Sequence, residues 1–378
     1  MKKTLLLLML LVILLFPTVG CTKESPTEFG NIYQIDSATV VVLRGSYREM
    51  GEQYGRLLND QIVKLDIHGM LLAMSLPETD PCNLEMYTKS KQESMVPANI
   101  RDFLQGIGEG APGVTYDEVL YCNVISSLFF KAGCSALAVC GSRAANEELV
   151  FGRNFDLFPL ANTNATDCAV ITVMHPDDGT QSTINFGYAG LPGAVSLSIN
   201  DEGMLGGINF SPSTDMSCDF MPLPLTLWRG LQQYETLQEV MDYLLETPRA
   251  GGTNLQLADP ATGTALSLEL SANHHAVRYP EEDILIATNY YVDSTMESYQ
   301  MAALGVERYA RLVDLVDEHP QPLSTDDVKA FLHASGVFQR GGTVQTQVYD
   351  PVADKIHFWL YGWSDYIELD TGDLFNLK

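Results

Sequence analysis

The Gly133-Cys134 pair stands where the chain changes from helix-forming to strand-forming sequence. An apolar run ending in Phe129-Phe130 precedes the pair, and the stretch "CSALAV" that follows has the composition of a β-strand. A cysteine thiolate is a strong nucleophile that can form a covalent acyl intermediate. A lone cysteine among apolar residues is more often a small core residue, so the residues around it must decide between the two interpretations.

A carboxylate is expected beside this cysteine. "CSALAV" and "ELVFGRNFD" predict a hairpin through the turn "CGSRAANE", and pairing centred on Ala145 places Cys134 opposite Asp156. A carboxylate raises the pKa of a neighbouring thiol. If the bond after Gly133 were cut, however, Cys134 would carry an α-amine of pKa about 7.7–8.0, a base attached to its own nucleophile. Asp156 would then hold this amine, and Gly133 would let the backbone bend for attack on its own carbonyl.

The elements that must position Cys134 begin with a largely helical first third. The stretch "TVVVLRG" predicts a strand, and a capping box of Ser46 and Glu49 opens a helix after it. A second capping box, Thr115 with Glu118, opens a mostly apolar helix that we expect to end just before the Gly-Cys junction.

After the junction, short β-rich runs alternate with turn residues, which is typical of antiparallel sheet. Helices are expected near 225–246, over about 296–317 and over 325–334, and the strands "TVQTQVYD" and "KIHFWLY" close the chain. This order predicts an α+β fold in which two packed sheets have helices outside them.

A series of motifs then occurs in a specific order along the chain: "LRGSYREMGEQYGRLL", "GCSALAV", "FGRNFDL", "GLPGAVSLSINDEGMLGGINFS", "IATNYY", "ERYARLVDLV" and "GGTVQTQVYDP". Together they resemble the N-terminal-nucleophile (Ntn) hydrolases of the isopenicillin-N acyltransferase-like (acyl-coenzyme A:6-aminopenicillanic acid acyltransferase) family. The choloylglycine hydrolases and penicillin V acylases are more distantly similar. The resemblance covers nearly all of the mature chain, and it implies a four-layer αββα sandwich and a precursor that cleaves itself before its nucleophile.

The resemblance also implies roles for residues near the junction. Cys134 would be the nucleophile and its freed α-amine the general base, with cleavage between Gly133 and Cys134. Arg153 and Asp156, both in "GRNFD", would orient the new terminus, since Arg153 can bind a carboxylate or carbonyl while Asp156 binds the ammonium.

Three residues further along the chain complete the implied site. Asn209 and Asn289 match two site asparagines, whose amides can donate to a developing oxyanion. Arg308 would support the site from the long helix, and Arg311, one turn further on, is its rival. The alternatives are turn-capping asparagines and arginines in ordinary surface ion pairs.

The first residues of the chain have the form of an export signal. Residues 1–20 predict a signal peptide whose apolar core is too short to span a membrane, and Val19-Gly20 before Cys21 resemble a lipoprotein processing site. Lipidated Cys21 would tether the protein to the cell envelope through residues 21–38; without lipidation the protein would be secreted. Residues 39–133 and 134–378 would form one domain, and the two fragments would stay associated after cleavage.

The composition excludes several classes of partner and cofactor. A formal net charge of −26 repels nucleic acid and anionic headgroups, so membrane contact is expected only through the lipid anchor. No CxxC pair occurs, the cysteine spacings fit no compact disulfide framework, and no histidine has metal-ligand spacing. We therefore expect neither a metal nor a cofactor.

These features predict an exported, self-processing cysteine Ntn hydrolase. Its substrate would be a small N-acyl compound, whose linear, non-peptide amide bond is cleaved through an acyl-enzyme. Transfer of the acyl group to an amine is the alternative, less favoured because an extracytoplasmic protein meets water freely and acyl-coenzyme A rarely. A non-catalytic ligand-binding lipoprotein on the same scaffold is the competitor from another class, and it would have no need of a new N-terminus at Cys134.

Overall fold

The computed structural model describes residues 30–65, 96–125, 132–157, 164–217, 219–350 and 352–378. The predicted signal peptide (1–20), Cys21 and the first part of the predicted tether lie outside these residues. No helix within the described ranges is long and apolar enough to span a membrane.

The predicted tether is wrong at its C-terminal end, because part of it belongs to a sheet. Strand β1 (Gly30–Ile35) pairs antiparallel with β2 (Ala38–Gly45). Asp36 makes the turn between them in a left-handed conformation, with φ of 50°. Tyr33 and Ile35 pack against the core between the sheets, so this hairpin has an apolar face that a solvated tether lacks.

The predicted capping boxes are confirmed. Glu49 bonds back to the backbone N–H of Ser46 at the start of α2 (Tyr47–Leu65), and Glu118 does the same for Thr115 at α6 (Tyr116–Ile125). Helix α5 (Ala98–Gly110) lies between them in the chain and packs on α2. The described part of α6 ends at Ile125, so the predicted continuation toward Gly133 falls on residues outside the described ranges.

Fifteen strands form two sheets in the described part of the chain. The first sheet has the order β1-β2-β5-β6-β7-β8-β9-β10-β11, and all its neighbours are antiparallel except β2 and β5. The second has the order β12-β3-β4-β13-β14-β15 and is antiparallel throughout. The remaining strands are β3 (Ala132–Val139), β4 (Val150–Leu157), β5 (Ala169–Pro176), β6 (Thr183–Tyr188), β7 (Leu197–Asn200), β8 (Leu205–Phe210), β9 (Thr253–Asp259), β10 (Thr264–Leu270), β11 (His275–Arg278), β12 (Ile284–Ala287), β13 (Thr343–Asp350), β14 (Lys355–Leu360) and β15 (Ile367–Asp370).

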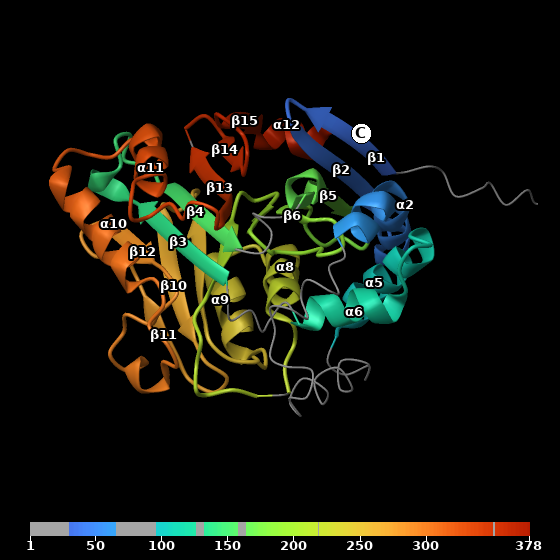
Figure 1. Ribbon diagram of the computed structural model, residues 1–378, viewed down its shortest axis with the longest axis horizontal. Helices are drawn as coiled ribbons and strands as arrows, with labels where there is room; N and C mark the ends of the chain where they lie inside the picture. The colour runs from blue at the N-terminus through green and yellow to red at the C-terminus, as the bar shows by residue number, and fades with distance from the viewer. Residues whose placement is uncertain (1–29, 66–95, 126–131, 158–163, 218, 351) are drawn as a thin grey trace, which may run out of the picture.

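The two sheets pack face to face, and helices cover their outer faces. An apolar core joins the inner faces, where the rings of Phe186 and Phe358 lie 5.2 Å apart between centroids. A second core joins the outer face of the nine-stranded sheet to α2, α5, α6, α8 (Leu223–Gln233) and α9 (Leu237–Glu246). A third joins the six-stranded sheet to α10 (Val306–Glu318) and α11 (Thr325–Leu332), which lie at the opposite end of Figure 1 from α2 and α5. The predicted α+β, four-layer αββα sandwich is confirmed.

The last helices differ from the prediction at their ends. A single helix over 296–317 is wrong: a short 3-10 turn (Glu297–Tyr299) is followed by α10 (Val306–Glu318). Gly305 precedes α10 with φ of 77°, a left-handed conformation that interrupts a continuous helix. Helix α11 (Thr325–Leu332) follows, and α12 (Thr371–Asn376) ends the chain.

Candidate active site

Strands β3 and β4 carry the Gly-Cys pair and the predicted carboxylate, but their register differs from the prediction by one residue. Gly133 pairs with Asp156, and Cys134 pairs with Phe155. The predicted pairing centred on Ala145 is wrong, because the connection, which contains a turn of 3-10 helix (Gly141–Arg143), closes on the pair Val139–Val150, whose centre lies between Ala144 and Ala145. Since side chains alternate along a strand, Cys134 faces the core between the sheets while Asp156 faces α10.

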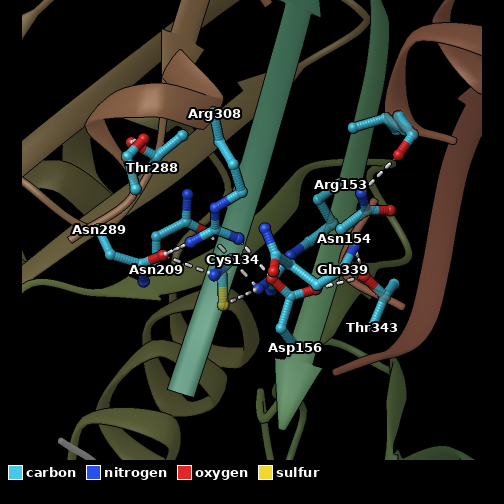
Figure 2. Close-up of polar contacts among 12 residues, drawn as sticks. Cys134, Arg153, Asn154, Asp156, Asn209, Thr288, Asn289, Arg308, Gln339 and Thr343 are labelled. Carbon is cyan, nitrogen blue, oxygen red and sulfur yellow. Dashed lines mark hydrogen bonds and ion pairs between the residues drawn. The ribbon is translucent and has the colours of Figure 1, made fainter. Parts of the chain in front are cut away.

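Asp156 is fully buried and bound on both carboxylate oxygens. Oδ1 accepts a hydrogen bond from the Thr343 hydroxyl at 2.7 Å, and Oδ2 pairs with Nη1 of Arg308 (Figure 2). A Cβ on Gly133 would lie 2.9 Å from this Oδ2 and 3.1 Å from Nη2 of Arg308. A side chain at position 133 would therefore force Asp156 or Arg308 to shift, which favours glycine in addition to any need for a flexible backbone.

A chain of hydrogen bonds leads from Asp156 to the backbone nitrogen of Cys134. Arg308 donates from Nη2 to Oδ1 of Asn289 at 2.5 Å, and the same oxygen accepts from the Cys134 N–H at 2.7 Å. The Asn289 amide nitrogen donates to the carbonyl of Phe210 at 2.6 Å. Asn289 thus reaches the atom that would become the α-amine, while its predicted role toward an oxyanion stays a prediction.

The structure separates the two rival arginines of α10. Arg308 is buried and bonds to Asp156 and Asn289, as described above. Arg311 forms an ion pair with Glu318 at 3.5 Å, and its side chain is 34% exposed. Only Arg308 of the two reaches the residues around Cys134.

Arg153 approaches Cys134 from the inner face. Its Nη2 donates to the carbonyl of Ile208 at 2.8 Å and lies 3.4 Å from the Cys134 Sγ and 3.5 Å from Oδ1 of Asn209. Asn209 donates from its amide to the carbonyl of Ala287 at 3.1 Å. The Nε and Nη1 atoms of Arg153 are buried without a hydrogen-bond partner, and no ion pair to a carboxylate is found for it within the described ranges.

The surroundings of Cys134 act on its thiol in opposite directions. Burial is the largest effect and raises the pKa of the thiol, and the Asp156 charge raises it further. The Arg153 guanidinium opposes both, because a positive charge favours the thiolate, but the pKa of the thiol remains above its ordinary value. Burial also lowers the pKa of Arg153 itself, since a charged group loses hydration there.

The structure therefore brings together all six predicted site residues: Cys134, Arg153, Asp156, Asn209, Asn289 and Arg308. Sequence reasoning missed Thr343, although it stands within the motif "GGTVQTQVYDP". No group of three or more His, Cys, Asp or Glu side chains placed to hold a metal occurs within the described part of the chain. The site therefore contains a buried thiol beside a guanidinium for which no ion pair is found within the described ranges. The backbone N–H of the same cysteine is bound by a side-chain amide.

Comparison with known proteins identifies the family. The model of the family described as acyl-coenzyme A:6-aminopenicillanic acid acyl-transferase matches residues 142–362, more than half of the chain. The chain belongs to this family. The segment matched by the acyl-transferase family model begins after Cys134, so the match does not include this residue.

Other relatives of this acyl-transferase family member are distant. An uncharacterized protein from Archaeoglobus fulgidus is 24% identical over an alignment of 331 residues that covers 72% of this chain and 54% of that protein, so the chain spans about half the length of this relative. An N-acylethanolamine-hydrolyzing acid amidase ortholog from Caenorhabditis elegans has a TM-score of 0.45 at 15% identity, covering 58% of this chain and 93% of its own. A penicillin V acylase from Agrobacterium tumefaciens has a TM-score of 0.41 at 12% identity, covering 64% and 88%. A mutant conjugated bile acid hydrolase from Clostridium perfringens has a TM-score of 0.43 at 11% identity, covering 64% and 94%.

Proposed function

We propose that this protein is a self-processing cysteine hydrolase that cleaves the linear amide bond of small N-acyl compounds. The observation that carries the proposal is the pair of contacts at Cys134. Its Sγ lies 3.4 Å from the guanidinium of Arg153, and its N–H donates to Asn289 at 2.7 Å. One contact favours the thiolate, and the other holds the nitrogen that cleavage would convert into an amine.

The proposed self-cleavage is an attack of the Cys134 thiolate on the carbonyl carbon of Gly133. A C–S bond forms and the C–N bond to Cys134 breaks, so the nitrogen leaves with a proton as a new α-amine. Water then hydrolyses the thioester, which releases the Gly133 carboxyl group and restores the thiol. Arg308 and Asp156 lie at the Gly133 side of this bond, and they support the strand while the bond is cut.

The proposed catalytic cycle uses the freed amine as its base. The amine accepts the proton of the Cys134 thiol, the thiolate attacks the acyl carbon of the substrate, and the leaving amine takes the proton. Water attacks the resulting thioester and regenerates the enzyme. Asn209 and Asn289 are proposed to donate hydrogen bonds from their amides to the developing oxyanion. In other enzymes one such donor lowers the activation free energy by about 3–4 kcal/mol.

The proposal includes an extracytoplasmic location and a lipid anchor at Cys21. Its support is the export-type sequence of residues 1–20 followed by Cys21. The two fragments are proposed to stay associated, because strands from both sides of the cut belong to the same sheet.

The deciding experiment is intact-mass analysis and N-terminal sequencing of the purified protein. We expect two fragments, of which the larger begins "CSALAV", and hydrolysis of chromogenic acyl amides. Cys134→Ala should stay a single chain and be inactive, while Cys140→Ala, which alters another buried cysteine of the same strand region, should be cleaved normally. A single uncleaved chain that hydrolyses amides would contradict the free-amine mechanism.

Acyl transfer is the second candidate, because the family's own description names an acyl-transferase. The two activities share the acyl-enzyme and differ in what resolves it. Product analysis with increasing amounts of an acceptor amine distinguishes them: a transferase diverts the acyl group to the amine, whereas a hydrolase keeps releasing the free acid.

A further inference from the structure

The segment that carries Asn289 runs across the inner face of the nine-stranded sheet. This segment, residues 287–293, begins at the last residue of β12, which is the edge strand of the other sheet. Three polar side chains face this segment from neighbouring strands: Asn209 on β8 pairs with Asn254 on β9, and Asn254 pairs with Glu269 on β10. All three are fully buried. We call Asn209, Asn254 and Glu269 the polar row.

The polar row binds the backbone of the segment on both sides of Asn289. Asn209 donates to the carbonyl of Ala287 at 3.1 Å. Asn254 donates from its amide nitrogen to the carbonyl of Thr288 at 2.9 Å and to that of Tyr290 at 2.6 Å.

Glu269 completes the row from the other side. Its carboxylate accepts the backbone N–H groups of Val292 and Asp293, each at 2.9 Å. Every contact of the row with the segment thus involves a backbone group, so the row fixes the path of the chain through Asn289.

The charge of Glu269 is balanced by Arg278, which is itself tied to the same region. Arg278 forms an ion pair with Glu269 at 3.2 Å and donates to the carbonyl of Ile286 at 3.2 Å. A buried carboxylate is costly unless it is paired and hydrogen-bonded, and a buried ion pair is weak evidence for stability alone. Its two backbone contacts point to a role in orienting residues 292–293.

We propose that Asn254 and Glu269 are positioning residues for the nucleophile, which act by holding Asn289 where its Oδ1 meets the Cys134 N–H. Asn289 makes that contact at 2.7 Å, and displacement by about 1 Å would break it. The proposal rests on the proposed function only for its kinetic consequence, because the hydrogen bond itself is present before any cleavage.

The test compares Asn254→Leu and Glu269→Gln with a matched control, Asn185→Leu. Asn185 is a buried amide of the same sheet that hydrogen-bonds to Thr183 and Ser198, away from residues 287–293. All three changes are made in the Cys134→Ala chain, where cleavage does not complicate the measurement. Hydrogen exchange is followed at single amides by mass spectrometry.

We expect the amide of residue 134 to exchange about tenfold faster or more in Asn254→Leu and Glu269→Gln, with the amides of Leu137 and Val139 unchanged. Asn185→Leu should leave residue 134 unchanged. An even rise across β9 and β10 without a specific change at residue 134 would show a merely structural role and overturn the proposal. Should Asn254→Leu fail to fold, Asn254→Ser, which admits water to the freed carbonyls, replaces it with the same expectation.

A kinetic arm in the chain with Cys134 separates this proposal from the proposed function. For cleaved enzyme, Glu269→Gln should lower kcat about tenfold with KM nearly unchanged, since it displaces a group at the nucleophile without touching bound substrate. A raised KM with constant kcat would overturn the positioning role. Absence of cleavage and turnover in the wild type would refute the proposed function, while the exchange measurement would still decide the role of the polar row.

Discussion

Two buried arginines lie near Cys134 on opposite faces of the six-stranded sheet, and their partners differ. On the outer face, Arg308 binds the carboxylate of Asp156 and the amide oxygen of Asn289. On the inner face, Arg153 has a carbonyl and the Cys134 thiol within reach, and its Nε and Nη1 atoms lack partners.

The difference indicates two separate uses of the same side chain. A guanidinium remains protonated in proteins, so a buried one without a directly bound carboxylate keeps a charge that can act on neighbouring groups. Arg308 is neutralised and holds the strand and Asn289 in place. The charge of Arg153 faces the Cys134 thiol, so it would stabilise the thiolate of the proposed mechanism.

The largest effect should come from removing the neutralised arginine. Arg308→Met leaves the Asp156 carboxylate buried without its counter-charge, so the free energy of unfolding should fall by about 3–5 kcal/mol. Urea denaturation of the Cys134→Ala chain measures it. Arg311→Met, which removes a partly exposed ion pair, is the control and should change it by about 1 kcal/mol or less. Equal losses in the free energy of unfolding would show that Arg308 stabilises the fold no more than Arg311 does.

The second-largest effect should come from removing Arg153, and it should lower catalytic activity while the free energy of unfolding changes little. Arg153→Met should reduce kcat/KM about a hundredfold or more, because it removes a charge that stabilises an anion in a buried site. Because the guanidinium lowers the pKa of the Cys134 thiol, its loss should shift the pH dependence of thiol alkylation to higher pH. Peptide mass analysis after iodoacetamide treatment measures the alkylation. An unchanged profile would mean that Arg153 does not act on the thiol.

A smaller loss is expected at the other oxygen of Asp156. Thr343→Val keeps the side-chain shape but removes the hydroxyl that donates to Oδ1, and hydrogen bonds to charged groups contribute about 1.5–3 kcal/mol. Thr343→Ser retains the donor and should restore most of the stability. Thermal unfolding of both variants measures the effect. If Thr343→Val and Thr343→Ser unfold at the same temperature, the hydroxyl does not stabilise the buried carboxylate.

The smallest expected loss of stability comes from adding a side chain at Gly133, next to Asp156 and Arg308 on the outer face. Gly133→Ala places a Cβ 2.9 Å from Asp156 and should destabilise the Cys134→Ala chain by about 1–3 kcal/mol, the usual cost of overpacking. Gly251→Ala is the control, because its Cβ would meet nothing closer than 3.5 Å. Both are measured by urea denaturation, and equal values would show that the outer face tolerates the added carbon.

Local sequence signals predicted the elements well where a specific interaction marks their start. The capping boxes at Ser46 and Thr115 are short-range hydrogen bonds, so the residues themselves specify them. The motif order predicted the layers of the fold. The end of the tether was missed because the two-residue turn at Asp36 closes a hairpin whose apolar side chains are few.

The pairing register of the strands and the contacts between distant segments were harder to predict than the identity of the site residues. The register of β3 and β4 depends on how the chain folds through residues 140–149, and one residue of slip moves Asp156 to the face opposite Cys134. Asn254 and Glu269 carry no recognisable local pattern, because their contacts depend on a segment brought from the other sheet.

The parallel pairing of β2 with β5 has a consequence for how the processed protein would unfold. Strand β2 precedes the cut at Cys134 and β5 follows it, so the nine-stranded sheet would be built from two separate polypeptides after processing. Unfolding would then release two molecules from one. By mass action, the midpoint of thermal unfolding of the processed form should rise with protein concentration, whereas that of the Cys134→Ala chain should not. Reassembly after full denaturation would require a second-order encounter, a step that the newly synthesised chain avoids.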